Sequence, residues 1–264
     1  MKIWIISGCS SGLGKCWTRS ILEDEQNLVI GITRNSESVT SLFQDFSERF
    51  IPCIADVNDE KGLKNKLIRL VQKYGSPHYV ITAAGYPQFG TIEDLSNQEI
   101  CQQFETNVIG SINVIRPVLP YMKDKIDSRI LLISSMAGVS CWPLLGAYQM
   151  SKHAIEALAE TLRLELEEFN IQVGVLQPGP YHTKWSNESA CKKEVSETYN
   201  SAELYKRARC GYTIEETQQS LPFFWAMFRE KEMPKRIVSS CEFAQRAITE
   251  AKNKIIDWKK NYEI

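Results

Sequence analysis

The stretch IWIISGCSSGLG, residues 3–14, decides the fold that this sequence predicts. Its first half is a short apolar run typical of a buried strand, and its second half is a loop of glycine and serine that opens a helix. Glycine permits a tight turn and lets a pyrophosphate approach backbone N–H groups at a helix N-terminus. A strand-to-helix turn without a ligand is the alternative interpretation. We expect a dinucleotide-binding loop made by Gly8, Ser10, Ser11, Gly12, Leu13 and Gly14.

Outward from this stretch, short apolar runs alternate with longer amphipathic segments. The predicted strands are 3–7, 28–33, 51–54, 79–82, 130–134 and 172–176, and the predicted helices are 13–25, 36–48, 59–74, 97–123 and 149–169. Such alternation predicts an α/β fold with a doubly wound parallel sheet and helices on both faces. We expect a single domain over residues 1–264. No seventh strand is clear, and 254–258 is a poor candidate for one.

The helix predicted at 149–169 has the clearest amphipathic pattern. Its apolar stripe consists of Ala154, Ile155, Leu158, Ala159, Leu162 and Leu166, and the opposite face carries Glu156, Glu160, Arg163 and Glu167. The two sets of side chains therefore lie on opposite faces of the predicted helix.

Charge and cysteine content exclude several classes of protein. Thirty-one Lys and Arg against 32 Asp and Glu give a net charge of -1, with both signs interspersed, so neither a nucleic-acid footprint nor a membrane-seeking basic face is expected. The eight cysteines include no C-x-x-C pair, so we expect no metal site and no disulfide framework. Reduced thiols predict a cytoplasmic protein, and the apolar run at the N-terminus is too short for a membrane span.

Tyr148 and Lys152 lie four residues apart near the start of the 149–169 helix. Residues at this spacing share one helix face, so the phenol and the ammonium can point into the same cleft. A nearby cation favours the phenolate and lowers the pKa of the phenol, which makes it a usable general acid and base. A half-buried tyrosine beside a solvated lysine is the alternative for this pair alone.

The end of the second predicted strand indicates the preferred dinucleotide. An NAD-binding fold places an acid there to bind the ribose 2′-hydroxyl, whereas this chain has Thr33 followed by Arg34. An arginine fork pairs well with a 2′-phosphate, so NADP(H) is favoured over NAD(H). A solvated Arg34 without a ligand is the alternative.

Taken together, these motifs resemble the short-chain dehydrogenase/reductase family over roughly residues 1–185. The loop at Ser7–Gly14 is similar to the family's T-G-x-x-x-G-x-G, with serine in place of threonine. Further positions match the family's acidic pair, fourth-helix asparagine, catalytic serine and P-G loop: Asp56, Val57, Asn107, Ser135, Pro178, Gly179 and Thr183. One departure is Thr82-Ala83-Ala84-Gly85, where the family usually has N-N-A-G, although Gly85 can still let the backbone pass close to the adenosine ribose.

The resemblance implies a Rossmann-type fold and an oxidoreductase that interconverts a carbonyl and a secondary alcohol on a small molecule. In this family Tyr148 would be the acid and base, Lys152 would lower its pKa and bind the nicotinamide ribose, Ser135 would bond the substrate oxygen, and Asn107 would hold a water. Cofactor contacts would come from Gly8, Ser10, Ser11, Gly12, Leu13, Gly14, Arg34, Asp56, Val57, Ala84, Gly85, Tyr148, Lys152, Pro178, Gly179 and Thr183.

Beyond the motifs, the family has a substrate-binding lid, which would span about residues 183–235 here. That region is rich in aromatic residues, and its apolar segment 222–228 favours a hydrophobic substrate, with packing of the lid or of a subunit contact as the alternative. A homodimer or homotetramer is expected. A catalytically idle NADP-binding sensor or scaffold is the alternative function.

Overall fold

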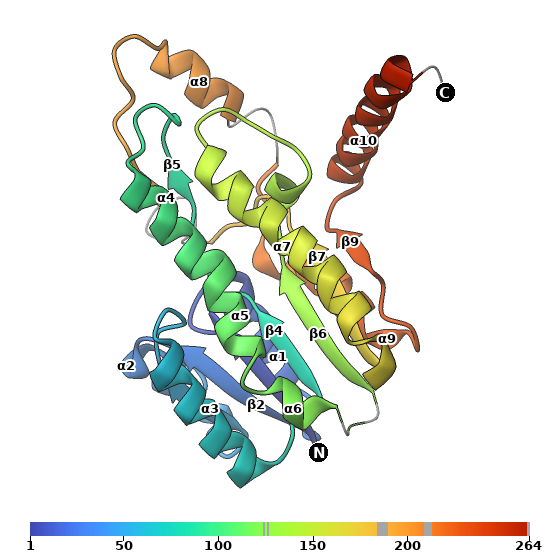
Figure 1. Ribbon diagram of the computed structural model, residues 1–264. Coiled ribbons are helices and arrows are strands. Elements are labelled where there is room, and N and C mark those ends of the chain that lie inside the picture. The colour runs from blue at the N-terminus through green and yellow to red at the C-terminus, as the bar shows by residue number, and fades with distance from the viewer. Residues whose placement is uncertain (124, 126, 184–189, 209–212, 263–264) are drawn as a thin grey trace.

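The protein is described by a computed structural model that covers residues 1–123, 125, 127–183, 190–208 and 213–262. Its centre is a seven-stranded sheet in the order β3-β2-β1-β4-β6-β7-β9 (Figure 1). The strands of this sheet are β1 (Lys2–Ser7), β2 (Asn27–Thr33), β3 (Phe50–Ile54), β4 (Tyr79–Thr82), β6 (Ser128–Ile133), β7 (Ile171–Gln177) and β9 (Arg236–Val238). Every neighbouring pair is parallel, which confirms the predicted doubly wound fold. A small second sheet pairs β5 (Gln88–Phe89) with β8 (Cys191–Lys192).

Helices cover both faces of the large sheet. They are α1 (Gly12–Leu22), α2 (Ser36–Leu42), α3 (Glu60–Tyr74), α4 (Asn97–Phe104), α5 (Gly110–Ile115), α6 (Leu119–Met122), α7 (Gly146–Glu165), α8 (Ser201–Ala208), α9 (Leu221–Arg229) and α10 (Cys241–Tyr262). None of the helices within the described residues is both long enough and apolar enough to cross a membrane.

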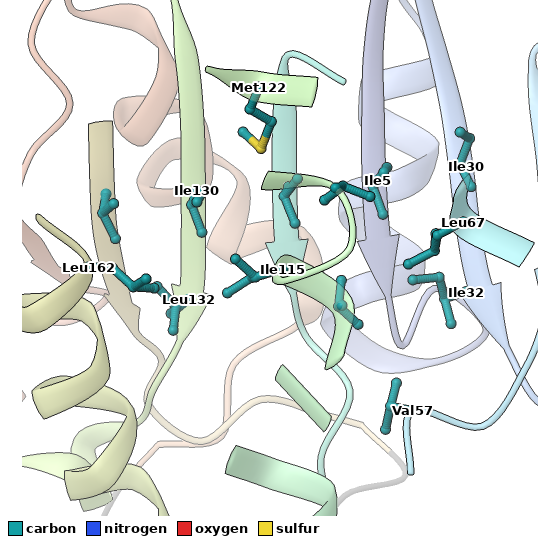
Figure 2. Close-up of a cluster of buried hydrophobic side chains, with 14 of the residues drawn as sticks. Ile5, Ile30, Ile32, Val57, Leu67, Ile115, Met122, Ile130, Leu132 and Leu162 are labelled. Atoms are coloured by element: carbon teal, nitrogen blue, oxygen red, sulfur yellow. The ribbon is translucent and has the colours of Figure 1, made fainter. Parts of the chain in front are cut away.

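Side chains from alternate positions of the strands enter two separate apolar cores. On one face, Ile5 and Ile30 pack with α3, α5 and α7, and Figure 2 shows this cluster. On the other face, Trp4 and Ile6 pack with α1 and α9. Because both faces of each central strand are buried, the strands have continuous apolar sequences, and this explains why they were predictable from sequence.

The helix predicted at 97–123 is interrupted. A π-helical turn at Glu105–Ile109 separates α4 from α5, and a further break precedes α6. Pro117 and Pro120 lack the backbone N–H that a continuous helix needs, which accounts for the second break. The apolar periodicity continues across these breaks, so it predicted one helix.

A seventh strand exists, but not near 254–258. β9 pairs with β7 through Val175–Arg236 and Gln177–Val238, whereas 254–258 lies inside α10. The three residues of β9 include a charged one and are too few for a recognisable strand pattern. An ion pair of Arg236 with Glu156 on α7 holds this edge in place.

The aromatic segment 222–228 forms most of α9 and packs in the core beside the sheet. Phe224 is fully buried and stacks on Trp17 with 5.1 Å between ring centres, and the indole of Trp225 donates a hydrogen bond to Ser20. This part of the predicted lid therefore supports the core, as in the packing alternative. The rest of the lid remains a prediction, and its residues 184–189 and 209–212 lie outside the described part of the chain.

Replacing Phe224 by alanine should lower the free energy of unfolding by about 3–5 kcal/mol, because a buried aromatic ring is exchanged for a cavity. Urea denaturation followed by circular dichroism measures this change. Phe223→Ala is the matched control, since the neighbouring ring is only half-buried and should cost less. Equal costs for the two variants would contradict the packing of α9.

Candidate active site

The residues singled out in the sequence gather at the carboxyl edge of the sheet. The edge begins with the glycine loop after β1 and continues with the segments that follow β4, β6 and β7. Because all these strands are parallel, loops distant in sequence emerge side by side. The start of α7 reaches the same edge and contributes Tyr148 and Lys152.

Tyr148 and Lys152 lie on one face of α7, as their spacing predicts. The Lys152 ammonium is 5.6 Å from the centre of the Tyr148 ring, and the two residues are 6% and 4% exposed, respectively. The Tyr148 ring packs in a small apolar cluster with Ala137, Leu145, Phe89 and Trp142. The phenol therefore sits in a largely dry environment next to a fixed cation.

The Lys152 ammonium donates a hydrogen bond of 2.9 Å to the backbone carbonyl of Ile133 at the end of β6. Burial lowers its pKa from 10.5 to about 8, and the nearby Glu156 carboxylate opposes this shift. The group is thus still mainly charged at neutral pH. A hydroxyl of Ser134 also bonds the Lys152 backbone carbonyl at 3.4 Å, which joins the strand end to the helix.

Glu156, on the charged face of the predicted amphipathic helix, is buried. The residue is 8% exposed, and its carboxylate accepts hydrogen bonds from Gln177 (2.9 Å) and from Arg236 (3.1 Å). Gln177 directly precedes the Pro178-Gly179 loop, so the carboxylate ties α7 to that loop. Its sequence position, four residues after Lys152, could have indicated that Glu156 lies beside the lysine, because residues at this spacing share one helix face. Its partner Arg236 belongs to the strand that the sequence did not predict.

Ser135 directly follows the end of β6 and starts a short 3-10 turn, Met136–Gly138. Its hydroxyl accepts a hydrogen bond of 3.2 Å from the Ala137 backbone N–H. The hydroxyl proton is not used in that bond and is available to a ligand oxygen. Ala137 belongs to the apolar cluster around Tyr148, so both hydroxyl-bearing residues border the same region.

Asn107 lies in the π-helical turn and is almost fully buried. Its amide accepts from the Tyr86 backbone N–H at 3.2 Å and donates to the Tyr86 carbonyl at 3.3 Å and to Ser151 at 3.0 Å. A side chain on Gly85 would lie 3.0 Å from the Asn107 amide oxygen and 3.8 Å from the Lys152 ammonium. Asn107 and Lys152 therefore border the same small space at Gly85.

The loop after β1 requires glycine at two positions. Gly8 has a φ of +73°, and a Cβ there would lie 2.8 Å from the Ala83 carbonyl oxygen. A Cβ on Gly14 would lie 2.2 Å from the Gly8 carbonyl oxygen. The loop is also bonded to the β4 end, since the Ala84 N–H donates to Ser7 at 3.1 Å.

A cavity of about 610 Å³ borders this loop. Ser10, Ser11 and Gly12 line it together with Thr183, which lies against Gly12, and the remaining lining comes from α1, Glu23, His182 and residues 217–221. Leu13 instead packs into the core beneath the loop. Thr183 lines this cavity, but Tyr148 does not. The cavity and the tyrosine therefore occupy different parts of the carboxyl edge of the sheet.

The remaining predicted cofactor residues also lie at strand ends. Arg34 is exposed immediately after β2. Asp56 follows β3, and its carboxylate accepts from the Asn58 backbone N–H at 2.9 Å. Val57 is buried beside Gly110.

The loop after β7 is held against its neighbours from two sides. The Pro178 carbonyl accepts from the Met136 N–H at 3.1 Å, and the Gly179 N–H donates to Ser239 at 3.0 Å. The loop that carries Thr183 is thereby fixed relative to the 3-10 turn after Ser135.

These residues fit a nicotinamide dinucleotide. Ser10, Ser11 and Gly12 expose a wall of an open cavity at the N-terminus of α1, where backbone N–H groups attract phosphate. No carboxylate side chain stands at the end of β2 to repel a 2′-phosphate, because that end carries Thr33 and Arg34.

Comparisons with known proteins identify the family. Residues 2–194 match the family model described as short chain dehydrogenase. Oxidoreductase BOA17 of Botryotinia fuckeliana is 31% identical over 255 residues, which cover 93% of this chain and 92% of the relative. The 3-ketodihydrosphingosine reductase of Bacteroides thetaiotaomicron is 29% identical over 78% of this chain and 74% of its own.

Solved structures show the same fold. A short-chain dehydrogenase from Streptomyces avermitilis superposes with a TM-score of 0.88 at 22% identity, covering 99% of this chain and 98% of its own. An alcohol dehydrogenase from Thermococcus sibiricus, complexed with 5-hydroxy-NADP, has a TM-score of 0.74 at 18% identity and covers 90% of this chain and 95% of its own.

The chain therefore belongs to the short-chain dehydrogenase/reductase family. It is an oxidoreductase of the kind that acts on CH–OH groups with a nicotinamide dinucleotide.

The pKa of Lys152 makes a testable contribution to stability. Its value of about 8 in the folded protein lies below the ordinary 10.5, so between these two pH values the unfolded chain binds more protons and stability rises with pH. We expect the difference in unfolding free energy between the wild type and Lys152→Met to change by roughly 2–3 kcal/mol across that window.

Urea denaturation at a series of pH values measures this difference. Lys61→Met, which removes an exposed lysine on α3, should leave the pH dependence of the wild type intact. Parallel pH profiles for the wild type and Lys152→Met would show that the ammonium is not desolvated.

Proposed function

We propose that this protein is an NADP-preferring oxidoreductase that interconverts a carbonyl and a secondary alcohol on a hydrophobic small molecule. The single observation that carries the proposal is the placement of the Tyr148 phenol beside the buried Lys152 ammonium, 5.6 Å from the ring centre to the nitrogen. Bound NADP(H) supplies the hydride, and the protein supplies the proton and the orientation of the substrate.

Tyr148 is proposed to exchange a proton with the substrate oxygen. The Lys152 cation favours the phenolate and so brings the pKa of the phenol closer to neutral pH. Ser135 would donate its free hydroxyl proton to the same oxygen and stabilise the charge that develops there. Asn107, which borders the same space as Lys152 at Gly85, would hold a water through which the lysine exchanges protons with solvent.

The cofactor would extend from the glycine loop to Thr183. Gly8, Ser10, Ser11, Gly12 and Gly14 would bind the pyrophosphate, with Leu13 anchoring the loop from below. At one end Asp56 and Val57 would contact the adenine. Ala84 and Gly85 would pass close to the adenosine ribose. At the other end the nicotinamide and its ribose would be contacted by Tyr148, Lys152, Pro178, Gly179 and Thr183.

The substrate is proposed to be a hydrophobic ketone or its alcohol. The carrying observation is the apolar surface of Leu145, Phe89 and Trp142 around Tyr148. Among the relatives, one is named a 3-ketodihydrosphingosine reductase, which supports a ketone substrate and the direction of reduction. The part of residues 183–235 that precedes α9 would close over this substrate as a lid.

A homodimer or homotetramer is proposed as the assembly, formed through α4, α5 and α7 as in the family. The idle sensor or scaffold alternative is not favoured, because the Lys152 ammonium lies beside the Tyr148 ring and borders the same space as Asn107 at Gly85.

Tyr148→Phe tests the role of the phenol. Loss of a general acid and base should lower kcat/KM for ketone reduction by about 10²–10⁴-fold. The Kd for NADPH, measured by fluorescence titration, should change little. Tyr74→Phe on α3 is the matched control and should retain full activity. Turnover that survives Tyr148→Phe would reject the mechanism.

Arg34→Ala tests the cofactor preference. Losing one charge-assisted contact to the 2′-phosphate should raise the Kd for NADPH by about 10–100-fold and leave the Kd for NADH unchanged. Arg69→Ala, an exposed arginine on α3, controls for the loss of one positive charge. Equal effects on both dinucleotides would remove the assignment of Arg34 to the 2′-phosphate.

A further inference from the structure

The C-terminal helix α10 projects away from the body of the protein (Figure 1). Its first turns are anchored: Phe243 is buried against Gly179, and the Arg246 guanidinium lies 4.4 Å from the centre of the Trp142 ring. Beyond them, every residue from Ala251 to Lys260 is exposed. The helix therefore has an anchored base and an exposed outer half.

An apolar stripe runs along α10 from its anchored base into the exposed half; we define it as Ala244, Ile248, Ala251, Ile255, Trp258 and Tyr262. These positions alternate at spacings of four and three, so they form one face of the helix. Ile255, Trp258 and Tyr262 are 45%, 63% and 74% exposed. A stripe of this size, extending over several turns, is unusual on a surface that contacts only water.

Charged residues are arranged around the stripe in a definite pattern. At 3.6 residues per turn, Lys252 and Lys259 border it on one side and Lys254 borders it on the other. The acids Glu250 and Asp257 lie away from the stripe. The apolar face is thus flanked by cations, and the negative groups face elsewhere.

This pattern disfavours a second copy of the chain as the occupant. In a parallel pair of helices joined along the stripe, Lys254 of one copy would face Lys259 of the other. In an antiparallel pair, each lysine border would face the same border of its partner. Either arrangement sets like charges against each other.

We propose that α10 docks the protein on an anionic lipid surface, with the apolar stripe buried among the headgroups. An apolar face with aromatic residues and lysine borders is the composition of a helix that lies in a membrane interface. Lysine ammonium groups reach the headgroups while their stems cover the apolar boundary, and tryptophan and tyrosine prefer this depth. This proposal does not depend on the reaction proposed above.

Docking would also orient the active site. β9 is parallel to β7, so α10 leaves the sheet at its carboxyl edge, the edge that carries Tyr148 and Lys152. The base of α10 touches Gly179 and Trp142, which lie in loops of that edge. A bilayer bound along α10 would therefore lie next to the carboxyl edge of the sheet, close to Tyr148 and Lys152.

Vesicle co-sedimentation tests the proposal with the full chain. We expect binding to vesicles of phosphatidylcholine with phosphatidylserine, little binding to phosphatidylcholine alone, and weakening at high salt. Ile255→Ser should lower the partition coefficient roughly tenfold, because a buried isoleucine side chain is lost. Replacing Lys252, Lys254 and Lys259 by glutamine should lower it by about a hundredfold.

Ile256→Ser is the matched control. Ile256 is exposed to a similar degree, 49% against 45% for Ile255, but lies outside the stripe, so this variant should bind almost as the wild type does. Circular dichroism establishes that each variant is folded.

Four results would overturn the proposal. They are absence of vesicle binding, equal binding to neutral and anionic vesicles, equal losses from Ile255→Ser and Ile256→Ser, and binding that survives the lysine replacements.

A lower oligomeric mass of Ile255→Ser in light scattering would assign the stripe to a contact between copies. Binding to immobilised polyglutamate without binding to vesicles would assign it to an acidic protein. Either assignment also replaces the lipid surface.

Discussion

The burial of the Lys152 ammonium is the constraint on which the rest of the active-site edge depends. A charge removed from water is costly unless polar groups compensate it. Here the compensation comes from the Ile133 carbonyl at the end of β6 and from the field of Glu156, one turn further along α7. Glu156 is in turn held by Gln177 of β7 and Arg236 of β9. The cation beside Tyr148 is therefore supported by three neighbouring strands.

The two edges of the parallel sheet serve different purposes. The amino edge is fastened by Arg129, which bonds Asp127 and the backbone carbonyls of Met227 and Glu230 and so locks the end of α9 to β6. The carboxyl edge is more open, with a cavity beside the glycine loop. Because the hydrogen bonds of Arg129 fasten the amino edge, the loops at the carboxyl edge can carry binding and catalytic residues.

The sequence predicted those features of the fold that leave a pattern in neighbouring residues. Six strands of the large sheet were predictable because their sequences are largely apolar. Five of them, β1, β2, β4, β6 and β7, are buried on both faces. β9 was not predictable, because its three residues depend on pairing with β7 and on Arg236. Likewise, Glu156 is a charged residue on the polar side of an amphipathic pattern, and only its contacts with Gln177 and Arg236 place it inside. The role of α9 was open, because an aromatic run can line a pocket or fill a core.

The sequence by itself determined the class of fold, the glycine loop and the pairing of Tyr148 with Lys152, because each of these depends on residues close together in the chain. Only the tertiary structure decided that Lys152 is desolvated, that Glu156 supports it, that α9 belongs to the core and that the outer half of α10 is exposed. Burial and charge pairing depend on contacts between different segments of the chain, such as Glu156 with Arg236, which lie 80 residues apart. Such contacts leave no local pattern in a single sequence, so they become visible only once the chain is folded.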